Sequence, residues 1–540
     1  MRNYYFWYVI CAAVAKMAHL PVRAVLIGSC VWSGFALATL IGLYLKHFLL
    51  VGSQLRRQFV LCVSLLAVTG LDVFGNLWNI LILHRPMAID FEQWSMDPII
   101  SWFDTLLLSP HHVAGLVLCM FAFLLTWKAE ENSRQQQTIS VILAAMALAS
   151  AFGTSIYVTF AFFLVMLAWG FWQIVIERTP RRALLLIASG TGAFILLIPY
   201  LWQLAHTSSG MQGGTPFAFA IREMIPSESL LSSSLLQHLA VSHPIASRNI
   251  AKLILLVPSY VLELGFFFLA FLCYLIPAYT GRKPLAHAHK SLLFIAVAII
   301  PLISLMRSSV LRFDDFGFRA PLLLQFSLLL LSSELLIAWG KTKSKTNVAP
   351  DLAEPRYNTP EWLRSASSLA LFFGVVSTVL QLLVLRTFIP LTEAQVRGRN
   401  NQDTGEVSHN AYLSYIGYAQ MDAAIPMDAI VQFNPAQPNP FAGITNTLNV
   451  NRQVVISTDE LWCGSELGGD PSGCPAMNAA IDPIFKSASA EQARAMCHLY
   501  GIQYLVAKVY DPAWNNMNGW VWTLPAVVSD KEFRVLDCRE

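Results

Sequence analysis

The sequence predicts an α-helical polytopic membrane protein, with about eleven transmembrane helices followed by a C-terminal extracytoplasmic α/β domain. Of the 540 residues, 55% are hydrophobic and only 13% are charged, whereas about 25% of the residues of a typical soluble protein are charged. The apolar residues form long runs, and a helix needs about 20 such residues to cross a bilayer. These runs recur as far as Ile389 and then stop. We therefore assign residues 1–390 to a membrane domain and residues 391–540 to a soluble domain.

The apolar runs give the expected membrane helices in order. The first run begins at Tyr4 and lacks a signal-peptidase pattern, so we interpret it as a retained helix. The turn around Thr154 is very short, which indicates that the helices on either side of it form an antiparallel hairpin. The expected helices lie near residues 3–20, 24–45, 59–84, 113–127, 138–152, 156–177, 183–203, 249–277, 291–306, 321–340 and 365–389.

Basic residues in alternate loops predict the topology. Short loops rich in Lys and Arg mark the cytoplasmic side of a membrane protein, and all of these loops fall on one side if the N-terminus is inside. The chain is then expected in a bacterial cytoplasmic membrane, with its C-terminal domain outside. The net charge of +3 gives no indication of a nucleic-acid partner. The basic loop residues are Lys46, Arg56, Arg57, Lys128, Arg134, Arg178, Arg181, Arg182, Arg282, Lys283, Lys290, Lys341, Lys343 and Lys345.

The C-terminal region has the pattern of a small α/β layer. The sequence predicts four strands, the last of them short, at residues 428–433, 453–457, 502–507 and 533–536. Residues 490–500 have helical spacing and end at Gly501, a common helix stop.

Four of the nine cysteines fall in this region, and an even number outside the cytoplasm indicates disulfides. The favoured pairing among three possible ones is Cys463 with Cys474 and Cys497 with Cys538. A zinc site is the alternative, but the spacing contains no CxxC motif. The other five are expected as small apolar residues of the membrane helices, and they are Cys11, Cys30, Cys62, Cys119 and Cys273.

Two acids are expected within membrane helices, where ionisable residues are candidates for function. Asp72 lies between Gly70 and Gly75, which would allow the helix to break there. Glu263 lies in the segment Tyr260-Val-Leu-Glu-Leu-Gly265. Each is either a structural acid that bonds a neighbouring helix or a functional group.

Two outer segments carry further candidates. The segment 85–112 holds acids and ends in Ser109-Pro-His-His112, where a histidine could bind phosphate or cap a helix at the membrane surface. The segment Arg307–Arg319 combines three arginines with two aspartates. Arginine forms bidentate hydrogen bonds to phosphate, and aspartates could hold the arginines or a divalent cation such as Mg²⁺ or Mn²⁺. A structural ion-pair cluster is the alternative.

The segments Gly70-Leu-Asp72, Ser109-Pro-His-His112, Tyr260–Gly265 and Asp314–Arg319 resemble those of uncharacterised bacterial membrane proteins related to the GT-C class of membrane glycosyltransferases. The resemblance implies transfer of a sugar from a polyprenyl-phosphate carrier to an acceptor outside the cytoplasm. It implies that one acid of the outer loop acts as the base and that cationic groups hold the lipid phosphate. The candidate bases are Asp90, Glu92, Asp97 and Asp104. The candidate substrate-binding residues are Arg312, Arg319, Asp314, Asp315, His111, Asp72 and Glu263.

The chain departs from the GT-C pattern in its first outer loop. Proteins of that class carry a key acid there, whereas Lys16–Arg23 contains none. Either a first helix pair is missing from an N-terminally incomplete or degenerate protein, or the acid comes from 85–112, or the protein is not a transferase. A transporter or lipid flippase and a non-catalytic envelope-assembly protein are the alternative functions, motivated by the mid-membrane acids and by the outer domain, respectively.

Overall fold

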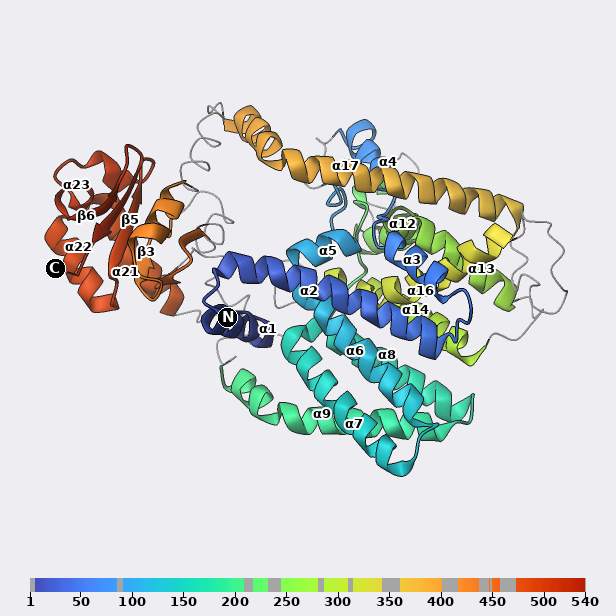
Figure 1. The fold of residues 1–540 in the computed structure, drawn as a ribbon. Helices are drawn as coiled ribbons and strands as arrows, with labels where there is room; N and C mark the ends of the chain where they lie inside the picture. Colours follow the sequence, from blue (N-terminus) through green and yellow to red (C-terminus); the bar gives the residue numbers. More distant parts are fainter. Residues whose placement is uncertain are drawn as a thin grey trace.

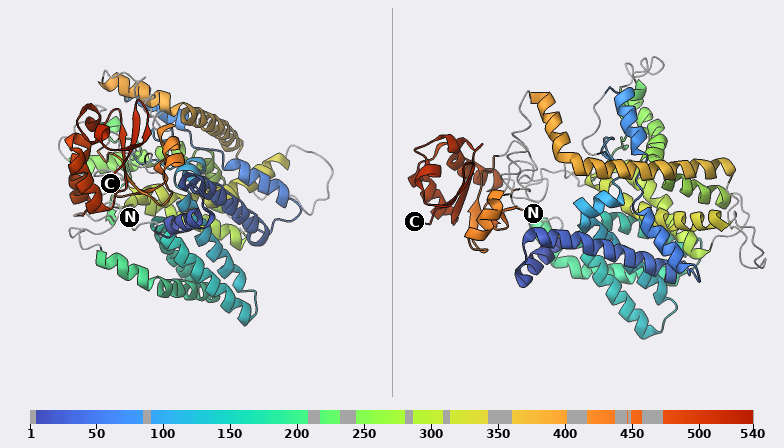
Figure 2. Two further views of the ribbon diagram at one scale, coloured as in Figure 1. Left: turned by 60° about the vertical axis from the view of Figure 1, so that its left-hand side comes forward. Right: turned by 45° about the horizontal axis from the view of Figure 1, so that its top comes forward.

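The computed structural model describes residues 5–84, 91–207, 217–231, 244–279, 286–308, 314–341, 360–400, 416–436, 446, 449–456 and 473–539. It consists of a bundle of long helices with a separate mixed α/β domain at one end (Figures 1 and 2). We refer to the side of the bundle on which the C-terminal domain lies as the outer side.

The described residues include nine helices long and apolar enough to cross a membrane, which confirms an α-helical polytopic protein. The expected count of about eleven is not confirmed, because two other apolar helices that the structure describes, around Phe6–Ala18 and Phe266–Ile276, are too short to cross a bilayer. The long membrane helices are α2 (Val22–Leu43, continued by a π-turn Tyr44–Phe48), α6 (Pro110–Ala129), α7 (Arg134–Thr154), α8 (Ile156–Val175), α9 (Pro180–Thr207), α12 (Pro244–Leu264), α14 (His287–Leu305), α16 (Pro321–Lys341) and α17 (Glu361–Asn400). The shorter helices are α1 (Tyr5–Ala18), α3 (Leu55–Leu65), α4 (Asp72–Leu81), α5 (Trp102–Leu108), α10 (Glu228–Leu231), α13 (Phe266–Tyr279) and α15 (Asp315–Arg319).

The expected first membrane helix, 3–20, is α1, which does not cross the bundle. Its 14 residues extend about 21 Å, less than the roughly 30 Å of a bilayer core. Phe6 packs against Tyr200 near the outer end of α9, with 5.4 Å between ring centroids. At the other end of α1, the N–H of Val22 donates to Asn451 of the C-terminal domain at 2.7 Å. Both ends of α1 therefore lie on the outer side, which does not fit the expectation that the N-terminus and the C-terminal domain lie on opposite sides.

Two broken helices cross inside the bundle. The helix expected over 59–84 is divided into α3 and α4, and α12 is separated from α13 at Gly265, whose φ is +50°. The N–H of Leu71 donates to the carbonyl of Leu262 at 2.6 Å. A Cβ atom at Gly70 would lie 2.4 Å from the carbonyl oxygen of Glu263, so only glycine permits this approach. The break expected beside Asp72 is confirmed.

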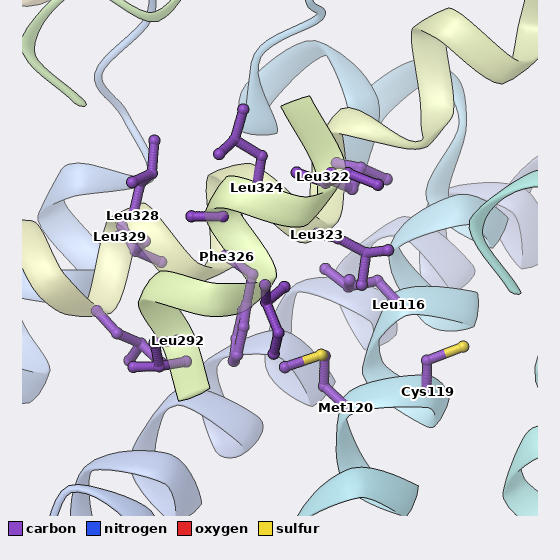
Figure 3. Packing of buried hydrophobic residues seen from close by; sticks show 14 of the residues in the cluster. Leu116, Cys119, Met120, Leu292, Leu322, Leu323, Leu324, Phe326, Leu328 and Leu329 are labelled. Carbon is purple, nitrogen blue, oxygen red and sulfur yellow. The ribbon is translucent and has the colours of Figure 1, made fainter. Parts of the chain in front are cut away.

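Helix α16 forms the centre of the membrane part. Within its most apolar window, 83% of the residues are buried, and its leucines pack against α6 and α14 (Figure 3). Because lipid tails are as apolar as leucine, close packing rather than exclusion of water stabilises this contact. Packing around α16 positions the outer ends of α6, α8 and α14, and the functional candidates lie beside these ends.

The C-terminal domain contains a five-stranded sheet. Its strand order is β4-β3-β5-β7-β6, with the first three strands parallel and β7 antiparallel to both β5 and β6. The four expected strands are confirmed, and β6 is the strand that the sequence did not predict. The bounds are β3 Ile430–Gln432, β4 Gln453–Val454, β5 Tyr504–Lys508, β6 Ala526–Ser529 and β7 Phe533–Asp537. Helices α21 (Gly473–Ser487), α22 (Ala490–Tyr500) and α23 (Trp520–Thr523) and the 3-10 turn η3 (Pro512–Asn515) complete the domain.

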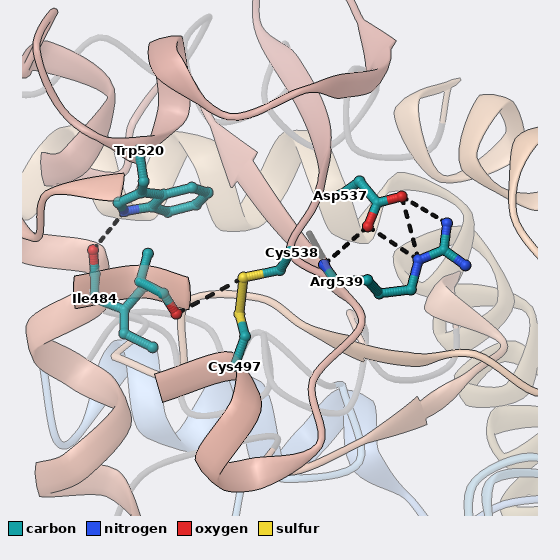
Figure 4. Close-up of a disulfide and its surroundings, with 7 residues drawn as sticks. Ile484, Cys497, Trp520, Asp537, Cys538 and Arg539 are labelled. Atoms are coloured by element: carbon teal, nitrogen blue, oxygen red, sulfur yellow. Dashed lines mark hydrogen bonds and ion pairs between the residues drawn. A yellow bond between two sulfur atoms is a disulfide. The ribbon is translucent and has the colours of Figure 1, made fainter. Parts of the chain in front are cut away.

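A disulfide joins Cys497 in α22 to Cys538 after β7 (Figure 4), which confirms this half of the expected pairing. Cys463 and the side chain of Cys474 lie outside the described residues, so their pairing stays a prediction. The five cysteines expected as apolar residues of the membrane helices are free thiols.

Candidate functional site

A pocket of about 190 Å³ opens on the outer side between the loop after α4, the segment 220–223, helix α12 and strand β2 (Met306–Ser308). Strand β2 pairs with β1 (Phe217–Phe219), and this pairing holds β2 beside the segment 220–223 that follows β1. The lining of the pocket combines charges of both signs. The lining residues are Met96, Asp97, Ala220, Ile221, Arg222, Glu223, Lys252, Met306, Arg307 and Asp314.

The three basic residues of the pocket differ in what they contact. Arg222 is buried and donates to the carbonyls of Asp97, Pro98 and Gly317 at 2.7–3.1 Å. The Lys252 ammonium lies 2.7 Å from the Glu223 carboxylate. Arg307 is exposed and forms no ion pair with any residue that the structure describes. Arg307 is therefore the cation of this pocket that is open to an anionic ligand.

Among the four candidate bases, Asp97 lies in the pocket. Its side chain is half-buried and makes no ion pair within the described part of the chain. The neighbouring Asp314 is already hydrogen-bonded, because its carboxylate accepts the N–H of Ser308 at 2.8 Å. Burial raises the pKa of the Asp314 carboxyl above its ordinary value. Asp97 is thus the more accessible of these two carboxylates.

Glu92 and Asp104 face away from the pocket into the protein. The Glu92 carboxylate accepts the backbone N–H of Ser101 at 2.8 Å, and Gln381 of α17 donates to Asp104 at 2.7 Å. Burial, with the like charges of Asp104 and Asp72, raises the pKa of Glu92 well above its ordinary value. Because the Glu92 carboxylate is buried and already bonded to Ser101, the geometry does not support Glu92 as the base.

The two mid-membrane acids also contact this loop. The indole N–H of Trp94 donates to Asp72 at 3.1 Å, and the N–H of Ile99 donates to Glu263 at 2.7 Å. Both side chains are almost fully buried. Asp72 and Glu263 therefore hold the loop and do not line the pocket.

The histidines and Arg319 form a neighbouring group that is not part of the pocket lining. His112 bonds the Ser155 hydroxyl at 2.8 Å, and His111 packs against the rings of Trp7 and Tyr8 of α1. Arg319 lies 3.8 Å from Asp315, one helical turn away. One ion pair of the kind that the alternative, a structural ion-pair cluster, would contain is thus present in α15.

Asp90 and Arg312 lie outside the described residues. In the part of the chain that the structure describes, no group of three or more His, Cys, Asp or Glu side chains is arranged to hold a metal ion. The possible divalent cation therefore stays a prediction.

Sequence reasoning missed Arg222 and Lys252 as site residues. Both are single basic residues within an outer segment and the helix that follows it, without a motif around them. The one available signal was their position on the predicted outer side. That is also the side of the arginine-rich segment, whose Arg307 lines the opposite wall of the pocket.

Comparison with solved structures finds archaeal oligosaccharyltransferases. One is the oligosaccharyltransferase AglB from Archaeoglobus fulgidus in complex with an inhibitory peptide and a dolichol-phosphate, with 11% identity and a TM-score of 0.41. Another is the apo form of the Archaeoglobus fulgidus oligosaccharyltransferase, with 12% identity and a TM-score of 0.39. Each comparison covers 94% of this chain and 62% of the other, so the chain spans less than two thirds of their length.

No protein-family model matches the chain, and no curated protein matches it significantly. The two solved neighbours are GT-C-type membrane glycosyltransferases, the class that the sequence resembles.

Proposed function

We propose that this chain transfers a sugar from a polyprenyl-phosphate carrier to an acceptor bound at the outer pocket. The observation that carries the proposal is the presence of an open cation, Arg307, and a half-buried carboxylate, Asp97, in the lining of one pocket. Glycosyl transfer from a lipid phosphate needs both a base and a cation at the leaving group.

In the proposed reaction, Asp97 accepts the proton of the acceptor hydroxyl as its oxygen attacks the sugar carbon. The bond between that carbon and the phosphate oxygen breaks, and its electron pair leaves with the lipid phosphate. Arg307 stabilises the phosphate, assisted by Lys252, whose charge is balanced by Glu223. Arg222 contributes by fixing the backbone of Asp97 rather than by binding substrate.

The transporter alternative rested on Asp72 and Glu263. Both carboxylates accept hydrogen bonds from the loop beside the pocket. Neither carboxylate is therefore open to bind a transported ion at mid-membrane. The transferase is therefore the function that the geometry supports best.

Titration of the purified protein with a short polyprenyl phosphate tests the proposal. Arg307→Ala should weaken binding about ten- to a hundredfold, because a hydrogen bond to a charged group contributes about 1.5–3 kcal/mol. Arg248→Ala is the matched control, since Arg248 is exposed on α12, pairs with Glu228 and does not line this pocket. Saturable binding that Arg307→Ala leaves unchanged would contradict the proposal, as would wild-type protein that does not bind.

A transfer assay is the second step of the test. Wild-type protein should move labelled sugar from a polyprenyl-phosphate donor to a water-soluble acceptor pool. Binding without transfer from any donor of this class would support a lipid-phosphate site but overturn the enzymatic function.

A further inference from the structure

Three successive residues of the loop beside the pocket are held by buried charged groups from two other elements. The carbonyls of Asp97 and Pro98 accept from Arg222, and the N–H of Ile99 donates to Glu263. Arg222 comes from the segment before α10, and Glu263 from the last turn of α12. The backbone from the Asp97 carbonyl to the Ile99 amide is therefore fixed.

Arg222 holds this loop from the pocket side. Its guanidinium makes four hydrogen bonds to carbonyls, of which the two to Asp97 measure 3.1 and 2.7 Å and the one to Pro98 measures 2.9 Å. The fourth joins Gly317 of α15 at 2.8 Å. Only 4% of Arg222 is exposed, so this guanidinium binds protein rather than substrate.

Glu263 holds the loop from the membrane side. Its carboxylate lies 2.7 Å from the Ile99 nitrogen, and only 4% of the residue is exposed. The end of α12 that carries it is itself fixed, because the Leu262 carbonyl accepts from Leu71 at the crossing of the broken helices. Glu263 is therefore a rigid anchor for the loop.

We propose that Glu263 is a positioning residue for the proposed transfer reaction: by accepting the Ile99 N–H, it sets the place of the Asp97 carboxylate in the pocket. This inference rests on the proposed function. Glu263 does not touch the pocket and acts only through the loop. A base displaced by about 1 Å can lose on the order of 100-fold in rate while substrate binding is kept.

Two substitutions separate positioning from a merely structural role. Glu263→Gln keeps an oxygen that can accept the Ile99 N–H, whereas Glu263→Leu removes it. Tyr260→Phe is the matched control, since Tyr260 is one turn away on α12 and its buried hydroxyl bonds the Ser304 hydroxyl at 2.8 Å rather than the Ile99 amide. The measured quantities are kcat, KM and the dissociation constant for polyprenyl phosphate.

The expected result is a kcat about 100-fold lower for Glu263→Leu, with the dissociation constant within about twofold of wild type. Glu263→Gln should rescue kcat to within about threefold of wild type. The positioning role is overturned if Glu263→Leu keeps its kcat. It is also overturned if Glu263→Leu loses no more than Tyr260→Phe, or if Glu263→Gln fails to rescue.

Hydrogen exchange of the Ile99 amide provides a readout that does not depend on activity. Exchange should be faster in Glu263→Leu than in wild type, and nearly unchanged in Glu263→Gln and Tyr260→Phe. If wild-type protein shows no transfer, the proposed function fails, whereas the exchange rates still decide whether Glu263 holds the loop. Equal exchange in all four proteins would show that Glu263 does not hold the loop, even if transfer is observed.

Discussion

Buried charge is accommodated in different ways in the membrane part and in the C-terminal domain. In the membrane part, three carboxylates accept N–H groups from a single loop: Asp72 from Trp94, Glu92 from Ser101 and Glu263 from Ile99. In the C-terminal domain, the buried Arg452 meets Asp422 together with backbone carbonyls.

Because of this difference, removing a buried charged group should have different consequences in the two regions. Where the partners of the buried acids all belong to one loop, losing an acid should displace that loop and the Asp97 side chain that it presents. In the C-terminal domain, losing Asp422 should cost stability without changing a distant site, because Arg452 is left buried without its charged partner. Four substitutions break or sharpen this contrast.

The largest effect is expected for Asp97→Asn. An amide cannot take a proton from the acceptor, so kcat should fall about 100- to 10,000-fold, the usual contribution of a general base. The dissociation constant for polyprenyl phosphate should stay within about twofold. Kinetic measurement beside Asp104→Asn, which changes a buried acid of the following helix α5, checks the assignment. A smaller kcat loss in Asp97→Asn than in Asp104→Asn would reverse it.

The next effect concerns the disulfide of the C-terminal domain. Cys497 and Cys538 are 41 residues apart, and closing a loop of that length stabilises a folded chain by about 4 kcal/mol in the chain-entropy model. The double substitution Cys497→Ser with Cys538→Ser should lower the unfolding free energy of this domain by roughly that amount. Urea unfolding followed by tryptophan fluorescence measures it.

Lipid binding at the outer pocket is the control for the disulfide variant, and it should stay unchanged below the unfolding transition. A loss of lipid binding without unfolding would show that the C-terminal domain and the outer pocket are coupled.

A pH effect is expected at Lys508, at the end of β5. Burial lowers the pKa of its ammonium to about 8, with Asp511 acting in the opposite direction, and its Nζ donates to Asn446 at 2.6 Å. Above pH 8 the folded state loses this proton while the unfolded state, with a lysine pKa of 10.5, keeps it. The unfolding free energy should therefore rise with pH, by on the order of 2 kcal/mol up to pH 10.

The window ends near pH 10 because burial raises the pKa of Tyr418 well above its ordinary value of 10.0. The unfolded state then loses a proton that the folded state keeps, so stability falls again with pH. Denaturant unfolding of wild type and Lys508→Met at pH 8 and pH 10 checks the assignment. A rise of the same size in Lys508→Met would assign it to another group.

The smallest effect is expected for Gly265→Ala at the helix crossing. Its φ of +50° is unfavourable for a residue with a Cβ atom by about 1–2 kcal/mol, and that atom would lie 3.3 Å from the Leu71 side chain. Thermal unfolding of the membrane part in detergent should show a modest loss. Gly28→Ala on α2 is the control, since nothing lies within 4 Å of a Cβ there. Equal stability of the two variants would remove the strain argument.

The sequence by itself determined the class of protein and much of the C-terminal domain. Long apolar runs can be accommodated only in a membrane, and alternating strands with a glycine helix stop are local signals. For that reason Gly501 correctly predicted the end of α22. The expected pairing of Cys497, in the predicted helix, with Cys538 near the end of the chain is confirmed.

Only the tertiary structure decided which acid faces the pocket and which helix crosses the bundle. Glu92, Asp97 and Asp104 are all acids of one outer segment in the sequence. In the structure, Ser101 donates to the Glu92 carboxylate and Gln381, far away in the chain, donates to Asp104, whereas Asp97 lines the pocket. The run at 3–20 is apolar enough for a span, yet packing of Phe6 at the outer helix ends keeps α1 on one side. Periodicity records which face of a segment is apolar, whereas depth and partners depend on contacts between residues distant in sequence.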